Sequence, residues 1–206
     1  IAVWQARELA ETAAKTALDR LAVGATEAPR GLSSEDGRLR TALRERARQL
    51  GGGSLSEGLG PLVEETAYTQ WHRMLFARFL AESGFLMHPS GVGVTLTECS
   101  DLARDEGAAD AWALAARYAG QMLPGIFRED DPVSQLRFSP EARVALERLL
   151  QNLPETVFAA SDSLGWVYQF WQARRKEEVN RADVKIGGRD LPAVTQLFTE
   201  DYMVRF

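Results

Sequence analysis

The stretch LGPLVEETAYTQWHRMLFARFLAESGFL, residues 59–86, has the clearest periodicity in the chain. Apolar side chains recur in it at three- to four-residue intervals, which is typical of a helix with one face in a protein core. They belong to Leu62, Val63, Tyr68, Trp71, Met74, Leu75, Phe79 and Leu80. The end of the stretch, Glu82-Ser83-Gly84, resembles the glycine cap that closes many helices. We therefore predict a long helix here at the centre of the fold.

Two further helices are predicted before this one. Residues 2–21 and 37–50 are rich in strong helix formers, and Ser33 or Ser34 can cap the second segment. The second segment also carries many arginines, which do not all share one helical face and therefore favour a solvated helix over a DNA contact. These arginines are Arg38, Arg40, Arg44, Arg46 and Arg48.

Helical patterns continue after the central stretch. They cover residues 98–122 with a break near Gly107, then residues 140–151 and 164–179, and a new element begins at residues 191–206. Ser139-Pro140-Glu141 has the hydroxyl cap, first-turn proline and early acid of a helix start. Residues 92–96 leave room for one short strand pair. The sequence thus predicts an all-α fold of roughly seven or eight helices with short connections.

A run of glycines divides the predicted helices. Gly51-Gly52-Gly53-Ser54 has high backbone entropy and predicts a flexible joint. It is not a phosphate-binding loop, because Leu55 and Ser56 follow where such a loop needs a lysine and a hydroxyl. We therefore divide the chain into a helical pair (1–50), a glycine-rich joint (51–60), a helical core (61–160) and a final segment (161–206).

Composition narrows the class of protein. The 206 residues are 45% hydrophobic, as in an ordinary globular protein, and the net charge of −5 argues against a surface that coats nucleic acid everywhere. No apolar run is long enough to span a bilayer, and the single Cys99 excludes an internal disulfide. We expect a cytoplasmic protein without a membrane segment. The start without Met and the apolar end at Phe206 lead us to expect a longer polypeptide.

Few residues predict chemistry by themselves. His72 and His88 have no Cys, Asp or Glu at a ligand spacing, so no metal site is predicted. Asn152-Leu153-Pro154-Glu155 places Glu155 where a base-flipping enzyme of the Asn-Pro-Pro-aromatic type needs a stacking ring. No glycine cluster follows a predicted strand in the way that a nucleotide-like cofactor requires. We therefore predict no catalytic residue in this chain.

Two segments near the end of the chain are the most informative. Residues 164–179, LGWVYQFWQARRKEEV, form an aromatic helix with a basic end, and residues 191–204, LPAVTQLFTEDYMV, begin a second helix that Thr199 can cap. Together they resemble the large adenine-specific DNA methyltransferases of the BREX and DISARM phage-defence systems and, more distantly, single-chain restriction-modification enzymes. Residues 65–86 support the resemblance through Tyr68, Trp71, Arg73, Phe79 and Gly84-Phe85-Leu86.

The resemblance implies where this chain lies in the parent enzyme. In these families such a segment comes immediately before the methyltransferase domain, so the chain resembles an N-terminal helical region that ends before the catalytic motifs. The element matching Phe198 and Thr199 closes over S-adenosylmethionine in related enzymes, which implies that both residues border the cofactor pocket of the full-length enzyme. Glu200 stands where many relatives have proline.

The basic residues around the end of the aromatic helix are candidates for contacts with DNA phosphates. Phosphate contacts would position a duplex without reading its sequence. Nearby acids, Glu177, Glu178, Asp183 and Asp190, leave the alternative of a neutral surface. Trp166, Phe170 and Trp171 are more typical of a core than of base stacking. The predicted DNA-binding residues are Arg174, Arg175, Lys176, Lys185 and Arg189.

Two functions remain open from the sequence. The first is a scaffold that presents double-stranded DNA, or another defence-system protein, to the C-terminal methyltransferase domain of the same polypeptide. S-adenosylmethionine would then be a cofactor of the full-length enzyme only. The second is an autonomous helical module for protein–protein interaction, which the acidic net charge equally permits. The sequence after Phe206 would separate the two.

Overall fold

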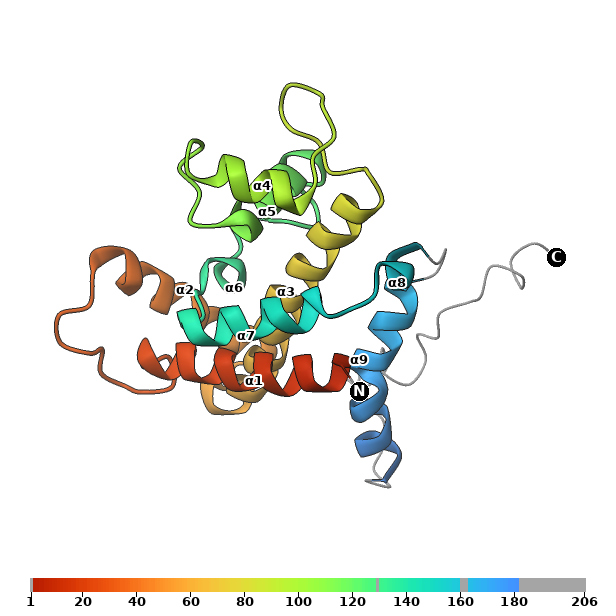
Figure 1. Cartoon of the computed structure of the whole chain (residues 1–206). Coiled ribbons are helices and arrows are strands. Elements are labelled where there is room, and N and C mark those ends of the chain that lie inside the picture. The colour runs from red at the N-terminus through yellow and green to blue at the C-terminus, as the bar shows by residue number, and fades with distance from the viewer. Residues whose placement is uncertain (1, 129, 160–162, 182–206) are drawn as a thin grey trace. The chain divides into compact units, whose positions relative to one another are not determined.

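The computed structural model describes residues 2–128, 130–159 and 163–181, which are entirely helices and connections (Figure 1). This confirms the predicted all-α class. The chain forms two compact units, residues 6–152 in one and residues 1–5 with 153–206 in the other. In chain order the helices are α1 (Ala2–Arg20), α2 (Ser34–Leu50), α3 (Leu55–Glu82), α4 (Leu96–Ala103), α5 (Ala111–Met122), α6 (Pro132–Gln135), α7 (Pro140–Gln151), α8 (Glu155–Ala159) and α9 (Ser163–Arg181).

Helix α3 is the long central helix that the periodicity predicted. Ser54 caps its start, accepting a hydrogen bond from the Glu57 amide. Gly84 follows its end at φ +70°, a left-handed conformation that glycine adopts without steric cost. Side chains of α3 contribute to two apolar clusters of the larger unit, one toward each end of the helix.

The first cluster joins α1, α2, α3 and α6. Leu43 of α2, Leu62 of α3 and Leu136 after α6 are almost completely buried in it. The backbones of α2 and α3 touch, because a Cβ atom added to Gly58 would lie 1.7 Å from the Ala47 carbonyl oxygen. Only a residue without a side chain allows this approach.

In the structure, the predicted glycine joint is the short connection between α2 and α3. Gly52 and Gly53 have φ values of +63° and +102°, and the Gly53 amide donates a 2.8 Å hydrogen bond to the Arg48 carbonyl. The run is therefore a tight turn that ends α2 and starts α3. Gly52 and Gly53 take left-handed backbone conformations in this turn, and α2 and α3 pack together on either side of it. The wider division of the chain at residues 51–60 stays a prediction.

The second cluster joins the C-terminal half of α3 to α4 and α5. Cys99, Leu114, Tyr118 and Phe127 are buried in it. Burial raises the pKa of the Cys99 thiol to about 11, so the thiol stays protonated at neutral pH. In Figure 1, α4 and α5 lie beside each other at the end of α3.

The short strand pair expected at residues 92–96 is reduced to one bridge. Met87 and Gly93 form an isolated antiparallel bridge, flanked by a 2.8 Å hydrogen bond from the Val94 amide to the Leu86 carbonyl. Pairing stops there because Thr95 is already the N-cap of α4. Its hydroxyl accepts from the Glu98 amide while the Glu98 carboxylate accepts from the Thr95 amide, a reciprocal cap.

The smaller unit contains α8 and α9 among its described residues. Phe158, Val167 and Trp171 are buried, whereas Phe170 is 51% exposed. The aromatic helix predicted at residues 164–179 is therefore present as α9. Trp171 agrees with the expectation of a core residue, and Phe170 does not.

Candidate functional site

The larger unit has a cleft of about 990 Å³ between α3, α5 and the segment that leads from α6 into α7. Its described lining includes arginines from five separate places in the chain and a single carboxylate, that of Asp110. We call this feature the arginine cleft and define it by its basic residues. They are Arg73, Arg104, Arg117, Arg137 and Arg143.

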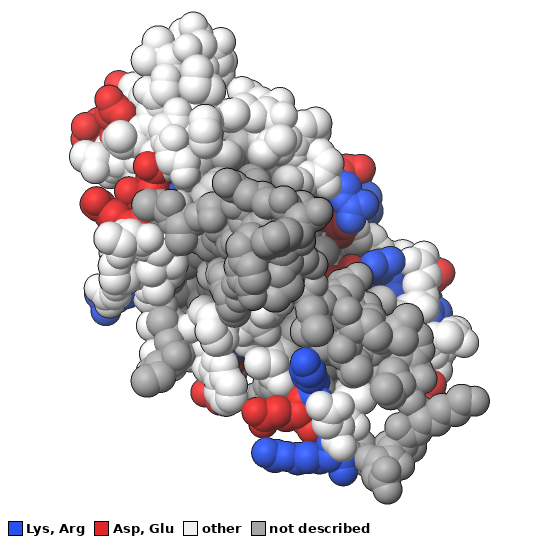
Figure 2. Space-filling view, turned by 90° about the vertical axis from the view of Figure 1, so that its right-hand side faces the viewer, with Lys and Arg blue, Asp and Glu red and all other residues white. Residues whose placement is uncertain are grey.

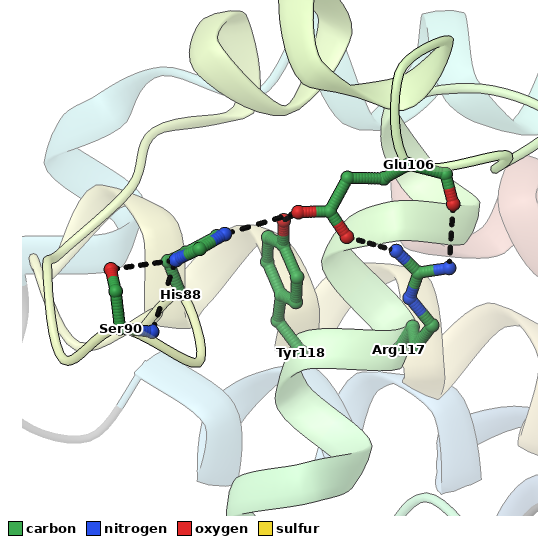
Figure 3. A network of polar contacts seen from close by, with 5 residues as sticks. All are labelled: His88, Ser90, Glu106, Arg117 and Tyr118. Atoms are coloured by element: carbon green, nitrogen blue, oxygen red, sulfur yellow. Dashed lines mark hydrogen bonds and ion pairs between the residues drawn. The ribbon is translucent and has the colours of Figure 1, made fainter.

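Arg117 is held by a polar network centred on Glu106 (Figure 3). One Arg117 nitrogen donates to the Glu106 carboxylate, and another donates to the Glu106 carbonyl at 3.0 Å. The Tyr118 hydroxyl donates to the same carboxylate at 2.7 Å. The Ser90 amide donates to Nδ1 of His88, which leaves the proton on Nε2, 3.0 Å from Glu106. All three side chains therefore converge on one carboxylate.

The charge states within this network follow from its contacts. Hydrogen bonds from Tyr118 and His88, together with the positive charge of Arg117, lower the pKa of Glu106. Burial, reinforced by the Glu106 carboxylate, raises the pKa of Tyr118 to about 12. Glu106 is thus an anion and Tyr118 a neutral donor at pH 7, and the anion fixes Arg117 at the edge of the cleft.

Arg143 of α7 forms ion pairs with two carboxylates. One of its terminal nitrogens lies 2.6 Å from Oδ2 of Asp110, and its Nε lies 3.6 Å from Glu147. Asp110 also caps α5, because its Oδ1 accepts a 2.8 Å hydrogen bond from the Ala113 amide. Burial and the neighbouring Asp110 raise the pKa of Glu147, and Arg143 opposes that rise. This cluster joins the start of α5 to α7.

Side chains of α3 hold the segment that carries Arg137. The Gln70 amide donates to the carbonyls of Val133, Ser134 and Leu136 at 2.8, 3.2 and 2.9 Å. Arg73 donates to the Ser134 carbonyl at 3.2 Å, and its guanidinium lies 5.9 Å from the Phe127 ring centroid. The floor of the cleft is thereby tied to α3.

Arg104 and Arg137 differ from the other arginines of the cleft. Both side chains are exposed, and neither makes an ion pair with the part of the chain that the structure describes. Elsewhere charges are mixed: on the face drawn in Figure 2, Lys and Arg atoms of described residues lie beside Asp and Glu atoms. The cleft therefore combines two exposed cations that have no acidic partner among the described residues with three that make polar contacts to other described groups.

Most residues that the sequence singled out lie outside the described part. Phe198, Thr199, Lys185 and Arg189 are not described, and Arg174 and Arg175 lie on α9 with side chains outside the described set. Lys176 is half-buried on α9. Their roles stay predictions. The sequence missed the arginine cleft because its five arginines are far apart in the chain and form no local pattern.

Neither a metal site nor a membrane-spanning helix is found among the described residues. They contain no group of three His, Cys, Asp or Glu side chains placed to hold a metal ion. Burial lowers the pKa of His72, which stacks on Tyr68 with ring centroids 5.2 Å apart. No described helix is long and apolar enough to cross a membrane.

Comparison with known proteins identifies relatives. No family model matches the chain, and no solved structure does. Adenine-specific methyltransferase PglX of Lacticaseibacillus casei (strain Zhang) is 27% identical over 193 residues, covering 73% of this chain. Adenine-specific methyltransferase BrxX of Escherichia coli O9:H4 (strain HS) is 25% identical over 201 residues, covering 81% of this chain.

These matches define a helical segment related to adenine-specific methyltransferases. The relation is to methylases of the BREX type, as the residues around the central helix and the aromatic helix predicted. The chain spans 16% of the length of each of the two relatives.

Proposed function

We propose that this chain is a non-catalytic helical region of an adenine-specific DNA methyltransferase that acts in phage defence. In this proposal it supports the catalytic part of the same polypeptide and helps to present double-stranded DNA to it in the cytoplasm. The observation that carries the proposal is similarity across most of this chain to two adenine-specific methyltransferases, each about six times longer than the matched share.

The proposal assigns roles to the predicted sites of the parent enzyme. Phe198 and Thr199 border bound S-adenosylmethionine, and the basic residues at and beyond the end of α9 touch DNA phosphates. The methyl donor itself binds to the methyltransferase domain, because a nucleotide-like cofactor needs a glycine-rich turn after a strand. The described residues, all helices and connections, support a positioning role for this region.

Methylation assays test the proposal. The isolated chain, incubated with duplex DNA and labelled S-adenosylmethionine, should incorporate no more label than a control without protein. The full-length parent should methylate the same DNA, and a parent that lacks residues 1–206 should lose most of that activity. Restoration by adding the isolated chain would assign the loss to this region. Incorporation by the chain alone, or full activity of the shortened parent, would contradict the proposal.

A second function is favoured by one surface feature. Phe85 and Val92, on the connection between α3 and α4, are 61% and 62% exposed, and exposed apolar side chains are common at protein interfaces. This favours a helical module for protein–protein interaction. A double variant of the parent, Phe85→Ser with Val92→Ser, tests this second function. It should retain DNA methylation but lose binding to another defence-system protein.

A further inference from the structure

The arginine cleft has more positive charge than its described surroundings balance. Arg117 and Arg143 are paired with Glu106, Asp110 and Glu147, whereas Arg104 and Arg137 face the cleft without a carboxylate partner among the described residues. Arginines that share one cleft make the electrostatic potential inside it positive, because the cleft walls exclude part of the water that would screen their charges. The site therefore favours an anion.

The donor geometry indicates which anion. A guanidinium presents several N–H groups in one plane, which match two oxygens of a phosphate better than they match a spherical ion. The walls between the arginines are mixed and include the apolar side chains of Phe138 and Pro140. Such walls can receive a sugar or the face of a base. A hollow of about 990 Å³ is large for a lone phosphate and at the upper end of the range for organic ligands.

We propose that the arginine cleft is a phosphate site that takes the sugar-phosphate backbone of a DNA strand. This inference rests on the proposed function, and it adds a DNA contact on the larger unit to the one proposed at the basic end of α9 in the smaller unit. Arg117 is hydrogen-bonded to Glu106 and Arg143 is ion-paired with Asp110, so two guanidinium groups have local partners before a ligand arrives. Arg104 and Arg137 supply the charge that the phosphate neutralises, so ordering them accompanies binding.

The chain provides a matched control for this proposal. Arg30 and Arg38 are also exposed and make no ion pair with the described residues, but neither lines the cleft. The Arg104→Glu and Arg137→Glu double variant and the Arg30→Glu and Arg38→Glu double variant therefore change the net charge equally. All four positions are exposed, so both proteins should fold, which circular dichroism and thermal melting would verify.

Binding of a labelled DNA duplex to the 206-residue chain is the measurement, repeated over a range of salt concentrations. The cleft variant should bind DNA at least about tenfold more weakly. The slope of log affinity against log salt concentration should be smaller in magnitude by about two. The control variant should keep the affinity of the unchanged chain within about twofold. Equal weakening of both variants would overturn the cleft as the site and leave a diffuse attraction.

Competition identifies the source of the phosphate. Inorganic phosphate and adenosine monophosphate are titrated separately against the chain and against the bound duplex. The proposal expects them to displace DNA only at concentrations far above that of the duplex. Tight binding of adenosine monophosphate without binding of DNA would overturn the assignment to a DNA strand. Loss of methylation in the shortened parent, together with equal binding by the two double variants, would overturn the cleft while the proposed function stands.

Discussion

Two sets of arginines in the larger unit show opposite uses of the same side chain. On α2, Arg40 donates to the carbonyls of Ala22 and Ala25 at 3.2 and 2.7 Å, and Arg44 donates to the Val23 carbonyl at 2.7 Å. These carbonyls follow the end of α1, where backbone acceptors lack helical partners. In the arginine cleft, Arg104 and Arg137 make no ion pair with described residues. The first set closes the fold, and the second faces a hollow.

The comparison shows that the partners of an arginine, and not the density of arginines, indicate its role. Burial and the neighbouring Arg40 and Arg48 lower the pKa of Arg44, which is a sign of crowding that its carbonyl bonds offset. A hydrogen bond to Glu65 raises the pKa of Arg46. Four of the five arginines of α2 thus bond within the protein, Arg40 and Arg44 to backbone carbonyls and Arg46 and Arg48 to glutamates. Arginines scattered over the chain create the basic cleft.

The largest effect should come from disturbing the contact that keeps α2 in place. In Gly58→Ala, the new Cβ would meet the Ala47 carbonyl, a backbone atom that cannot rotate away, so α2 and α3 must separate. We expect a loss of about 3 kcal/mol in the free energy of unfolding, at the upper end for overpacking. Urea denaturation measures it.

Gly60 on the same helix provides the control for that substitution. A Cβ added there meets nothing within 4 Å apart from its chain neighbours, so Gly60→Ala lacks the clash with α2. The helix propensity of alanine and the crowding of its Cβ against Pro61 oppose each other, and we expect a change of less than about 1 kcal/mol. Equal effects of the two substitutions would show that α2 and α3 do not touch, and the arginines of α2 would then lose their structural interpretation.

A moderate effect is expected when an α2 arginine is removed. Arg44→Ala breaks its hydrogen bonds to the Val23 and Ala25 carbonyls and should cost about 1 to 2 kcal/mol of unfolding free energy. Arg104→Ala should change that free energy by less than about 0.5 kcal/mol, because it removes no internal bond. Thermal melting of both variants checks this. A cleft arginine that mattered as much as Arg44 would end the distinction between the two sets.

The sequence predicted those parts of the fold that depend on local periodicity. The central helix and α9 follow from apolar spacing, and the start of α7 follows from Ser139-Pro140-Glu141, whose serine accepts from the Ala142 amide. The Thr95 cap was not anticipated, and the sequence of residues 92–96 leaves room for a short strand pair. Short-range patterns do not show which of two local structures the neighbouring chain completes.

Features that depend on distant partners were not predictable in the same way. The role of Gly58 requires knowledge that Ala47 lies against it, and a glycine run in the sequence equally indicates a joint. The Glu106 network joins residues of the α3–α4 connection, the α4–α5 connection and helix α5, and these residues share no sequence motif. His88 could be recognised in the sequence only as a histidine without metal ligands. Folding gives it a carboxylate partner on another segment.

The smallest effect should appear when the anion behind Arg117 is removed by Glu106→Gln. The pKa of Glu106 is lowered in the folded protein, so its contribution to stability is present above the unfolded value of roughly 4.3 and is lost as the pH falls through the lower folded value. The variant should therefore be less stable than the unchanged protein at pH 7, and the difference should shrink as the solution is acidified. Glu64 is exposed and makes no ion pair with described residues, so Glu64→Gln is the control for replacing a glutamate by glutamine. Absorbance titration of tyrosine adds a second measurement. Burial is the main cause of the raised pKa of Tyr118 and Glu106 the next, so Glu106→Gln should lower that pKa from about 12 toward its ordinary value without reaching it. A stability difference that persisted unchanged in acid, with an unaltered Tyr118 titration, would mean that Glu106 acts through packing and does not hold Arg117 by its charge.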